Sequence, residues 1–140
     1  MKILSVDLGS KNVGLAVCDE LGISVSPAGT VPRKSNAMLV EAIIRQARRR
    51  EADAIVVGHP INMDGTAGRA AKDAEKIAAM IALAGGPPVT LFDERLSSWE
   101  AENLLIEAGA SRKKKRTLVH EAAAAVILRS YLEAKRQDNP

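Results

Sequence analysis

The sequence predicts an α/β protein built on a mixed five-stranded sheet, in which an antiparallel meander is followed by parallel strands and helices flank the sheet. Three apolar runs come first, within residues 2–31, and the turns between them are too short for a crossover. After residue 35, strand-like apolar runs alternate with helical segments. Only helical crossovers of this kind can join parallel strands. A chain of 140 residues fits one domain, which we place at residues 1–137, with a frayed tail at 138–140.

The first three strands are predicted at Lys2–Asp7, Val13–Cys18 and Ile23–Val31. Pro27 cannot donate a ladder hydrogen bond, so the third strand should lie at an edge or contain a bulge. The remaining elements follow from apolar spacing and from cap and turn residues. They are a helix from Ser35 or Asn36 to Arg50, a strand at Ala54–Val57, a loop at Gly58–Gly68, a helix at Arg69–Ala84, a strand at Val89–Phe92, a helix from Ser97 or Ser98 to Ala108, and a helix at Leu118–Lys135.

Composition excludes several classes of protein. Aromatic residues make up only 2% of the chain, so no aromatic platform for stacking single-stranded bases is available. Cys18 is the only cysteine, which excludes a disulfide framework. Neither a signal peptide nor an apolar stretch of membrane-spanning length is evident, and we expect a cytoplasmic protein without a membrane partner. The net charge of +3 hints at a polyanionic partner only where the positive charge is clustered.

Carboxylates follow two of the predicted strands. Asp7 ends the first strand, and Asp93 and Glu94 follow the strand at Val89–Phe92. The carboxyl ends of parallel strands share one edge of a sheet, and ligand crevices lie at that edge where the strand order reverses. We therefore expect these acids and the Gly58–Gly68 loop to form one site.

Positive charge is clustered in two places. Arg45, Arg48, Arg49 and Arg50 crowd the last turns of the helix that ends at Arg50. Cations at a helix C-terminus suit the helix dipole. We interpret these arginines in that way, with a nucleic-acid contact as the alternative. The second cluster is the run of five basic residues at 112–116.

Four segments carry a resemblance to a known family: DLGSKNVG, VVGHPINMDGTAG, DERLSSWEAENLL and HEAAAAVILRSYL. They resemble the four blocks of the pre-16S rRNA nuclease family (YqgF/RuvX), whose members are Holliday-junction-resolvase-like proteins of the ribonuclease H superfamily. The resemblance spans nearly the whole chain. It implies a ribonuclease H-like fold and a divalent-metal-dependent hydrolase of phosphodiester bonds with three catalytic acids.

The resemblance also assigns candidate catalytic and metal-binding residues. Asp7 matches the first acid and Glu94 the second, whereas His120 stands at the position of the third, with Glu121 directly after it. Two Mg²⁺ ions roughly 3.5 to 4 Å apart can activate water and neutralise the departing oxygen. Imidazole suits Mn²⁺ or other transition metals better than Mg²⁺. The expected cofactor is therefore Mg²⁺ or Mn²⁺, with either His120 or Glu121 replacing the third acid.

Several residues are candidates for binding substrate. Lys11 and Arg95 adjoin the acid motifs and could grip phosphate, although Arg95 could equally form a salt bridge with Asp93. Asn62 could contact substrate from its loop, whereas Asp64 suits ordinary turn chemistry. The basic run just before His120 should hold a phosphate backbone without reading sequence. It consists of Arg112, Lys113, Lys114, Lys115 and Arg116.

Three functions remain open at this stage. The first is a metal-dependent endonuclease acting on structured RNA or branched DNA, which the resemblance relates to maturation of the 5′ end of pre-16S rRNA, with Holliday-junction resolution as a variant. The second is a non-catalytic nucleic-acid-binding module, suggested by His120. The third is an actin-like phosphotransferase, because such kinases also open with an Asp-x-Gly turn, but 140 residues cannot supply their two-domain clamp. We expect a monomer or a weak homodimer.

Overall fold

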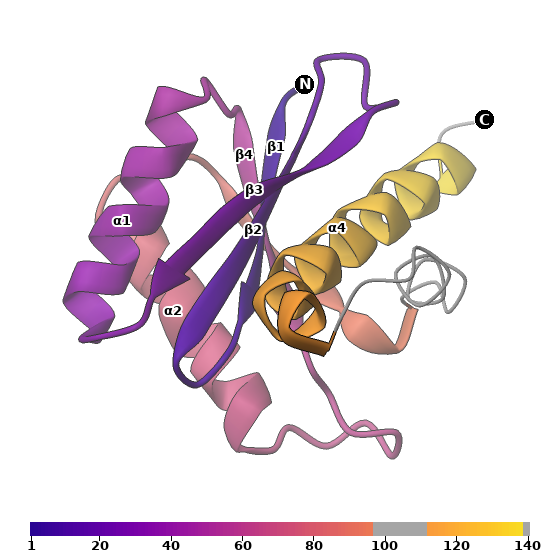
Figure 1. Ribbon diagram of the computed structural model, residues 1–140. Coiled ribbons are helices and arrows are strands. Elements are labelled where there is room, and N and C mark those ends of the chain that lie inside the picture. Colours follow the sequence, from indigo (N-terminus) through magenta and orange to yellow (C-terminus); the bar gives the residue numbers. More distant parts are fainter. Residues whose placement is uncertain (97–111, 139–140) are drawn as a thin grey trace.

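A computed structural model describes residues 1–96 and 112–138, and it confirms the mixed five-stranded sheet (Figure 1). The elements are β1 (Ile3–Leu8), β2 (Asn12–Cys18), β3 (Val25–Pro32), α1 (Asn36–Arg49), β4 (Ala54–His59), α2 (Arg69–Leu83), β5 (Val89–Asp93), a 3₁₀ turn η1 (Glu94–Leu96) and α4 (Arg112–Asp138). No helix in these described ranges is long and apolar enough to cross a membrane.

The strands lie in the order β3-β2-β1-β4-β5. The pairs β1–β2 and β2–β3 are antiparallel, as the short turns predicted. The pairs β1–β4 and β4–β5 are parallel, because helices α1 and α2 make the crossovers. β3, which contains Pro27, is an edge strand, and its register with β2 shifts between Gly14 and Ala16. The predicted topology is therefore confirmed.

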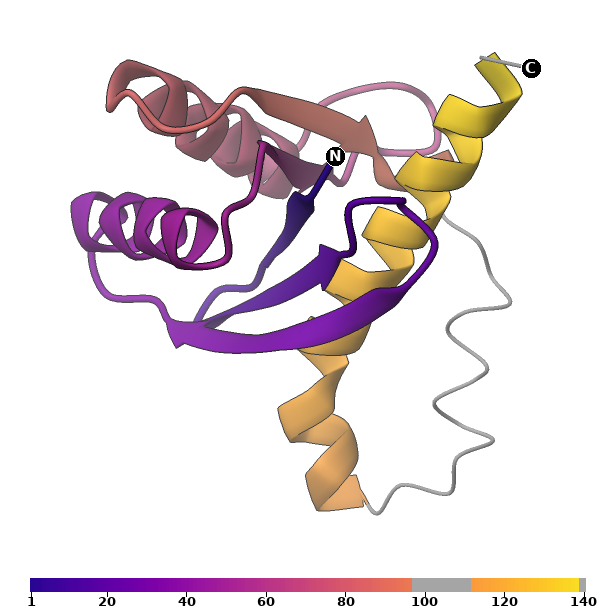
Figure 2. The ribbon, with the colours of Figure 1, turned by 90° about the horizontal axis from the view of Figure 1, so that it is seen from above.

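Helices cover both faces of the sheet (Figure 2). Alternate side chains of a strand point to opposite faces, so Leu4 and Val6 pack into one core with α1 and α2. Ile3 packs into a second core with α4. Ser5 and Asp7 follow the same alternation toward α4. One face of the sheet thus presents Asp7 to α4, whereas the other holds the larger aliphatic core.

Helix α1 shows how local sequence sets the boundaries. Ser35 is its N-cap, and the Ser35 hydroxyl accepts a hydrogen bond from the Met38 N–H at 3.1 Å. Leu39, Ile43 and Ala47 recur at helical spacing and are buried. The helix starts near the carboxyl end of β1 and ends near the start of β4, at the opposite end of the strands.

Three predicted boundaries were wrong. β4 runs through Gly58 and His59, where a loop was expected, because both residues pair with β5. α4 begins at Arg112, six residues before the predicted Leu118, so the backbone of the basic run is helical. Lysine and arginine are good helix formers, which accounts for this extension. α4 also continues to Asp138, one residue into the expected frayed tail. The helix predicted from Ser97 or Ser98 to Ala108 lies outside the described residues.

Candidate active site

Asp7 and His120 meet between β1 and α4. Asp7 is the penultimate residue of β1, and His120 lies on the turn of α4 that crosses this end of the strand. Nδ1 of His120 lies 3.3 Å from Oδ2 of Asp7. Burial raises the pKa of the Asp7 carboxyl, and the hydrogen bond and charge of His120 offset part of that rise. The pair joins residues that are 113 positions apart in the sequence.

Glu94 shares this site with Asp7. It is the first residue after β5, and its carboxylate reaches across β4 at Gly58. A Cβ atom at Gly58 would lie only 2.9 Å from Oε1 of Glu94. Burial, and then the negative charges of Asp7 and Asp93, raise the pKa of Glu94 to about 7. The two strand-end carboxylates therefore interact, as the parallel arrangement predicted.

Glycines allow α4 to approach the sheet closely enough to form the site. Gly14 pairs with Asp7 across β1 and β2. A Cβ atom at Gly14 would lie 2.0 Å from the His120 carbonyl oxygen, and one at Gly9 would lie 2.6 Å from Cε1 of the His120 ring. No side chain fits at Gly14 unless α4 shifts, and at Gly9 an added Cβ would also lie 2.3 Å from the Asn12 carbonyl oxygen. The glycines of the first motif thus make room for both the backbone and the imidazole of His120.

A buried hydroxyl fixes α4 along β1. Ser5 is fully buried, and its Oγ donates a hydrogen bond to the carbonyl oxygen of Ala124 at 2.7 Å. Ala124 lies about one helical turn after His120, and Ser5 lies two residues before Asp7 on the same face of β1. This bond therefore helps to set the register that brings His120 to Asp7.

The donor atoms of this site suit a divalent cation. Among the described residues, no group of three or more His, Cys, Asp and Glu side chains is arranged as a complete metal-binding cluster. However, two carboxylates with raised pKa values share a partly buried space with an imidazole. A cation would offset the repulsion between these carboxylates, and carboxylate oxygens are ligands that Mg²⁺ and Mn²⁺ accept. The residues therefore fit a metal whose remaining ligands come from water or phosphate.

Comparison with known proteins assigns the family. The RuvX family, described as Holliday junction resolvase, matches residues 1–134. The chain belongs to this family. Relatives named "Putative pre-16S rRNA nuclease" include one from Lachnospira eligens, 43% identical over 143 residues that cover 98% of this chain and all of the relative. One from Geobacillus kaustophilus is 43% identical over 141 residues, covering 97% of this chain and all of the relative.

Solved structures confirm the ribonuclease H-like fold of this RuvX-family chain. It is similar to Thermus thermophilus RuvC in complex with a Holliday junction substrate, with a TM-score of 0.58, 15% identity, and coverage of 97% of this chain and 96% of that one. It is also similar to the Fowlpox virus resolvase bound to Holliday junction DNA, with a TM-score of 0.60, 15% identity, and coverage of 96% and 99%. These likenesses concern the fold alone.

Within the RuvX-family motifs, His120 rather than Glu121 contacts Asp7. Among the described side chains, Asp7 has a contact with His120 and none with Glu121. The backbone nitrogen of Glu121 instead lies against Gly14. The structure thus places the imidazole, and not the following carboxylate, beside Asp7.

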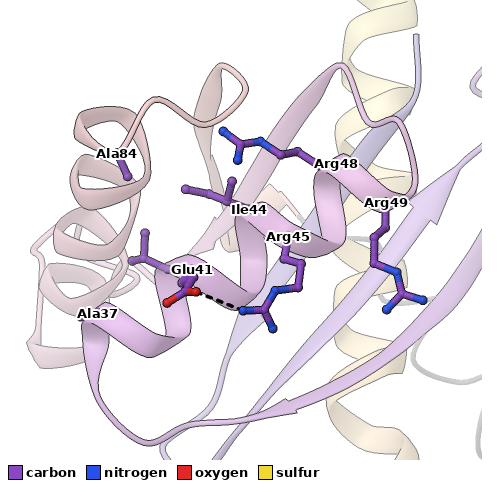
Figure 3. Close-up of a pocket in the computed structure, with 8 residues that line it drawn as sticks. Ala37, Glu41, Ile44, Arg45, Arg48, Arg49 and Ala84 are labelled. Atoms are coloured by element: carbon purple, nitrogen blue, oxygen red, sulfur yellow. Dashed lines mark hydrogen bonds and ion pairs between the residues drawn. The ribbon is translucent and has the colours of Figure 1, made fainter.

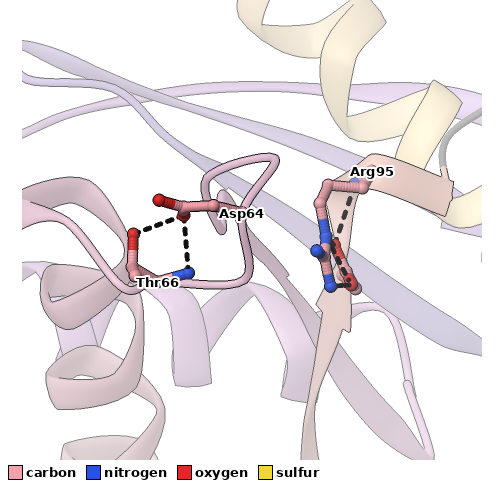
Figure 4. Close-up of polar contacts among 4 residues, drawn as sticks. Asp64, Thr66 and Arg95 are labelled. Carbon is pink, nitrogen blue, oxygen red and sulfur yellow. Dashed lines mark hydrogen bonds and ion pairs between the residues drawn. The ribbon is translucent and has the colours of Figure 1, made fainter.

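Asp93 and Arg95 form the salt bridge that the sequence offered as one of two possibilities (Figure 4, in which Arg95 is labelled). Nη2 and Nε of Arg95 lie 2.7 and 3.0 Å from Oδ2 of Asp93. Hydrogen bonds from Arg95 hold the pKa of Asp93 below its usual range. The neighbouring acids therefore have different environments, because the pKa of Glu94 is raised and that of Asp93 is lowered.

The loop after β4 is a hydrogen-bonded turn. Asp64 accepts hydrogen bonds from the N–H and the hydroxyl of Thr66 at 2.9 and 2.6 Å (Figure 4), which is the turn chemistry expected of it. Asn62 is exposed, and its Nδ2 donates to Oγ1 of Thr66 at 3.0 Å. The side-chain amide of Asn62 therefore supports the turn, and its exposed position leaves contact with a ligand open.

The basic candidates flank the acids. Lys11 is exposed in the turn between β1 and β2. Residues 112–116 form the first turns of α4, which extend beyond the sheet at the edge where β1 ends (Figure 2). The side chains of this run lie outside the described part of the structure.

Arg33 is a residue that the sequence analysis missed. It follows β3, and its guanidinium lies between the β1–β2 turn and α2. Nη1 donates to the Gly9 carbonyl at 3.1 Å and to Asp73 at 2.7 Å, and Nη2 donates to Asp73 at 2.6 Å. No spacing rule links residues 40 positions apart, so only the tertiary structure shows this contact.

Proposed function

We propose that this chain is a divalent-metal-dependent endonuclease that hydrolyses phosphodiester bonds in structured RNA during maturation of the 5′ end of pre-16S rRNA. The observation that carries the proposal is that Asp7, at the carboxyl end of β1, lies 3.3 Å from His120 on α4 and interacts electrostatically with Glu94 at the end of β5. The names of the relatives support an RNA substrate, and the ribonuclease H-like fold is compatible with nuclease chemistry. A ribosomal RNA substrate would support a cytoplasmic location.

Asp7 and Glu94 would hold Mg²⁺ or Mn²⁺, with His120 as a further ligand or a neighbouring base. When bound, the metal would supply the charge that activates water and stabilises the departing oxygen. A site with two ions is our expectation, in which case Asp7 is the natural shared ligand.

The side chains themselves perform three tasks in this proposal. Asp7 orients the imidazole of His120 through the contact at Nδ1. The Nε2 atom of that ring is then directed away from Asp7, where it can accept or deliver a proton. Glu94, whose pKa burial and the charges of Asp7 and Asp93 raise to about 7 in the absence of metal, would lose its proton to hold a cation.

Basic side chains would hold the RNA. We assign phosphate contacts to Lys11, in the turn after β1, and to the five basic residues at 112–116, because this run precedes His120 on α4. Contacts to phosphate position a nucleic acid without reading its sequence. Asn62 is a further candidate for contact with substrate. Arg95 is a weaker one, since its guanidinium is already paired with Asp93.

The direct test is cleavage of a ribosomal RNA precursor and of a four-way DNA junction, side by side, with Mg²⁺ and with Mn²⁺. The wild-type chain should cut the precursor, and Asp7→Asn should remove cleavage while circular dichroism stays unchanged. Asp19→Asn is a matched control, because Asp19 follows β2 at the opposite edge of the sheet. Wild-type rates from a folded Asp7→Asn protein would refute the catalytic assignment.

A non-catalytic nucleic-acid-binding module is the second candidate, because the resemblance aligns His120 with the family's third acid. Tight binding of the precursor without cleavage in either metal would favour this module. Preferential cleavage of the junction would favour a resolvase. Binding of ATP would support the actin-like phosphotransferase. Sedimentation of the same samples would test the expected monomer or weak homodimer.

A further inference from the structure

A hollow of about 430 Å³ lies between α1 and the end of α2, on the face of the sheet opposite α4 (Figure 3). Its floor is apolar and includes Ile44 and Ala84, and its rim carries Arg45, Arg48 and Arg49. We call this hollow the α1 groove. We propose that the α1 groove binds the phosphate backbone of RNA, as a second anchor for the substrate of the proposed nuclease, on which this inference rests.

The rim arginines differ in their partners. Arg45 is paired with Glu41 at 3.1 Å, one helical turn earlier. Arg48 and Arg49 are exposed, and neither has a carboxylate within 4.0 Å among the described residues. The next arginine, Arg50, donates instead to Gln46 and to the Ala28 carbonyl. Two unneutralised guanidinium groups therefore border the α1 groove.

The helix dipole alone does not account for this arrangement. Arg48 and Arg49 lie in the last turn of α1, where a cation suits the helix dipole, but the dipole does not occupy the N–H donors of their guanidinium groups. Each free guanidinium offers several N–H donors in a planar fork that matches phosphate oxygens. The alternative interpretation of these arginines, contact with nucleic acid, is thus better supported by the structure than by the sequence.

The chemistry of the α1 groove favours a phosphate backbone over bases. None of the described residues that line it is aromatic, so it lacks the aromatic platform on which successive bases stack. Its small floor residues also provide no deep apolar pocket for a bulky side chain of a protein partner. Sequence-independent contact with a polyanion is what remains.

The position of the α1 groove determines which RNA can use it. α1 has 14 residues and is therefore about 21 Å long. It begins at the edge of the sheet that holds Asp7, and Arg48 and Arg49 lie at its far end. Only a substrate that extends past the cleavage site can reach both places. Long structured precursors should therefore depend on the α1 groove more than short duplexes do.

The test uses fluorescence anisotropy with a labelled ribosomal precursor RNA, in EDTA so that no cleavage occurs. Arg48→Gln combined with Arg49→Gln should lower affinity for every long sequence to a similar extent. The slope of log K against log salt should fall by up to about 1.8, at about 0.9 for each lost duplex phosphate. Lys72→Gln combined with Lys76→Gln is the matched control, since both lysines are exposed on α2 and neither lines the α1 groove, and its slope should stay at the wild-type value.

Three outcomes would overturn the inference. The first is an unchanged salt slope in the double variant, with circular dichroism showing that α1 is intact. The second is an equal loss in the variant that combines Lys72→Gln with Lys76→Gln, which would indicate a general effect of net charge. The third is loss of binding to polyglutamate but not to RNA, which would assign the α1 groove to an acidic protein. If the groove variants weaken RNA binding but no cleavage is found in any metal, the nuclease proposal fails and the inference about RNA binding stands.

Discussion

Arg33 and Asp73 form a bidentate ion pair that ties the end of β3 to the first turns of α2, with nitrogen–oxygen distances of 2.6 and 2.7 Å. The side chain of Arg33 is only 14% exposed. Its Nη1 also donates to the Gly9 carbonyl, two residues after Asp7. The pair therefore holds the β1–β2 turn in place, and that turn carries Lys11 beside the candidate active site.

Breaking the Arg33–Asp73 ion pair should lower the stability of the fold. Asp73→Asn leaves the Arg33 charge partly buried without its partner, and we expect it to lower the free energy of unfolding by about 1–3 kcal/mol. Arg33→Lys should have a similar effect, because lysine cannot span both Asp73 and Gly9. Urea unfolding of both single variants and the double variant measures the coupling. Additive losses would show that the two residues do not act together. Glu41→Gln, in the exposed pair with Arg45, should change stability by less than about 1 kcal/mol.

Gly14→Ala should disrupt the packing of α4 on β2. The added methyl group would overlap the His120 carbonyl, so α4 would have to shift, and we expect a loss of about 2–4 kcal/mol with impaired cleavage. Gly68→Ala is the control, because its Cβ would meet nothing closer than 3.5 Å. That change should cost about 1 kcal/mol or less, from the weaker N-cap preference of alanine. Urea unfolding and cleavage rates measure both variants, and equal losses would show that contact with α4 is not the cause.

The residues in and around the candidate active site could be predicted from the sequence to different extents. Asp7 and Glu94 were predictable, because acids that end parallel strands meet at one edge of a sheet. His120 was found only through family resemblance, since a histidine in a helix carries no positional signal of its own. Arg33 gave no signal, because its contacts with Gly9 and Asp73 exist only after α1 and α2 have packed. The start of α4 was misplaced because the charged run resembles a solvated loop, although each of its residues favours a helix.

The pKa of Glu94 predicts how stability depends on pH in the absence of metal. Its pKa is about 7 in the folded chain, against an ordinary value of 4.5, so the folded state binds this proton more tightly than the unfolded state. The contribution of Glu94 to the free energy of unfolding is therefore fully present below about pH 4.5 and is lost as the pH rises through about 7. Glu94→Gln should raise the melting temperature at pH 8 and flatten this part of the profile. Because the carboxyl is only partly buried, we expect a gain on the order of 1 kcal/mol.

Asp93 provides a control of opposite sign. Arg95 lowers the pKa of Asp93. The contribution of Asp93 to the free energy of unfolding is therefore present at neutral pH, and it is lost as the solution is acidified below the ordinary pKa of an aspartate. Asp93→Asn should therefore lower the melting temperature at pH 8. Thermal unfolding in EDTA from pH 4 to 8 measures both variants. Parallel profiles for Glu94→Gln and the wild type would show that burial does not raise the Glu94 pKa.

The third metal ligand can be tested at His120. Its imidazole lies 3.3 Å from Asp7, whereas Glu121 makes no contact with that acid among the described residues. His120→Asp would replace a nitrogen ligand by a hard oxygen ligand and add negative charge beside Asp7. Mg²⁺ prefers oxygen ligands more strongly than Mn²⁺ does. Cleavage supported by Mg²⁺ should therefore rise relative to cleavage supported by Mn²⁺.

Two further variants separate the possible roles. His120→Ala should lose activity with both metals if the imidazole is a ligand or a proton carrier, and Glu121→Gln should be nearly silent. The opposite pattern would assign the third acid to Glu121. If all variants cleave at the wild-type rate in titrations of each metal, catalysis rests on Asp7 and Glu94 alone. Circular dichroism must first show that α4 is intact, because His120 also packs against Gly9 and Gly14, and a displaced helix would lower activity without any loss of a ligand.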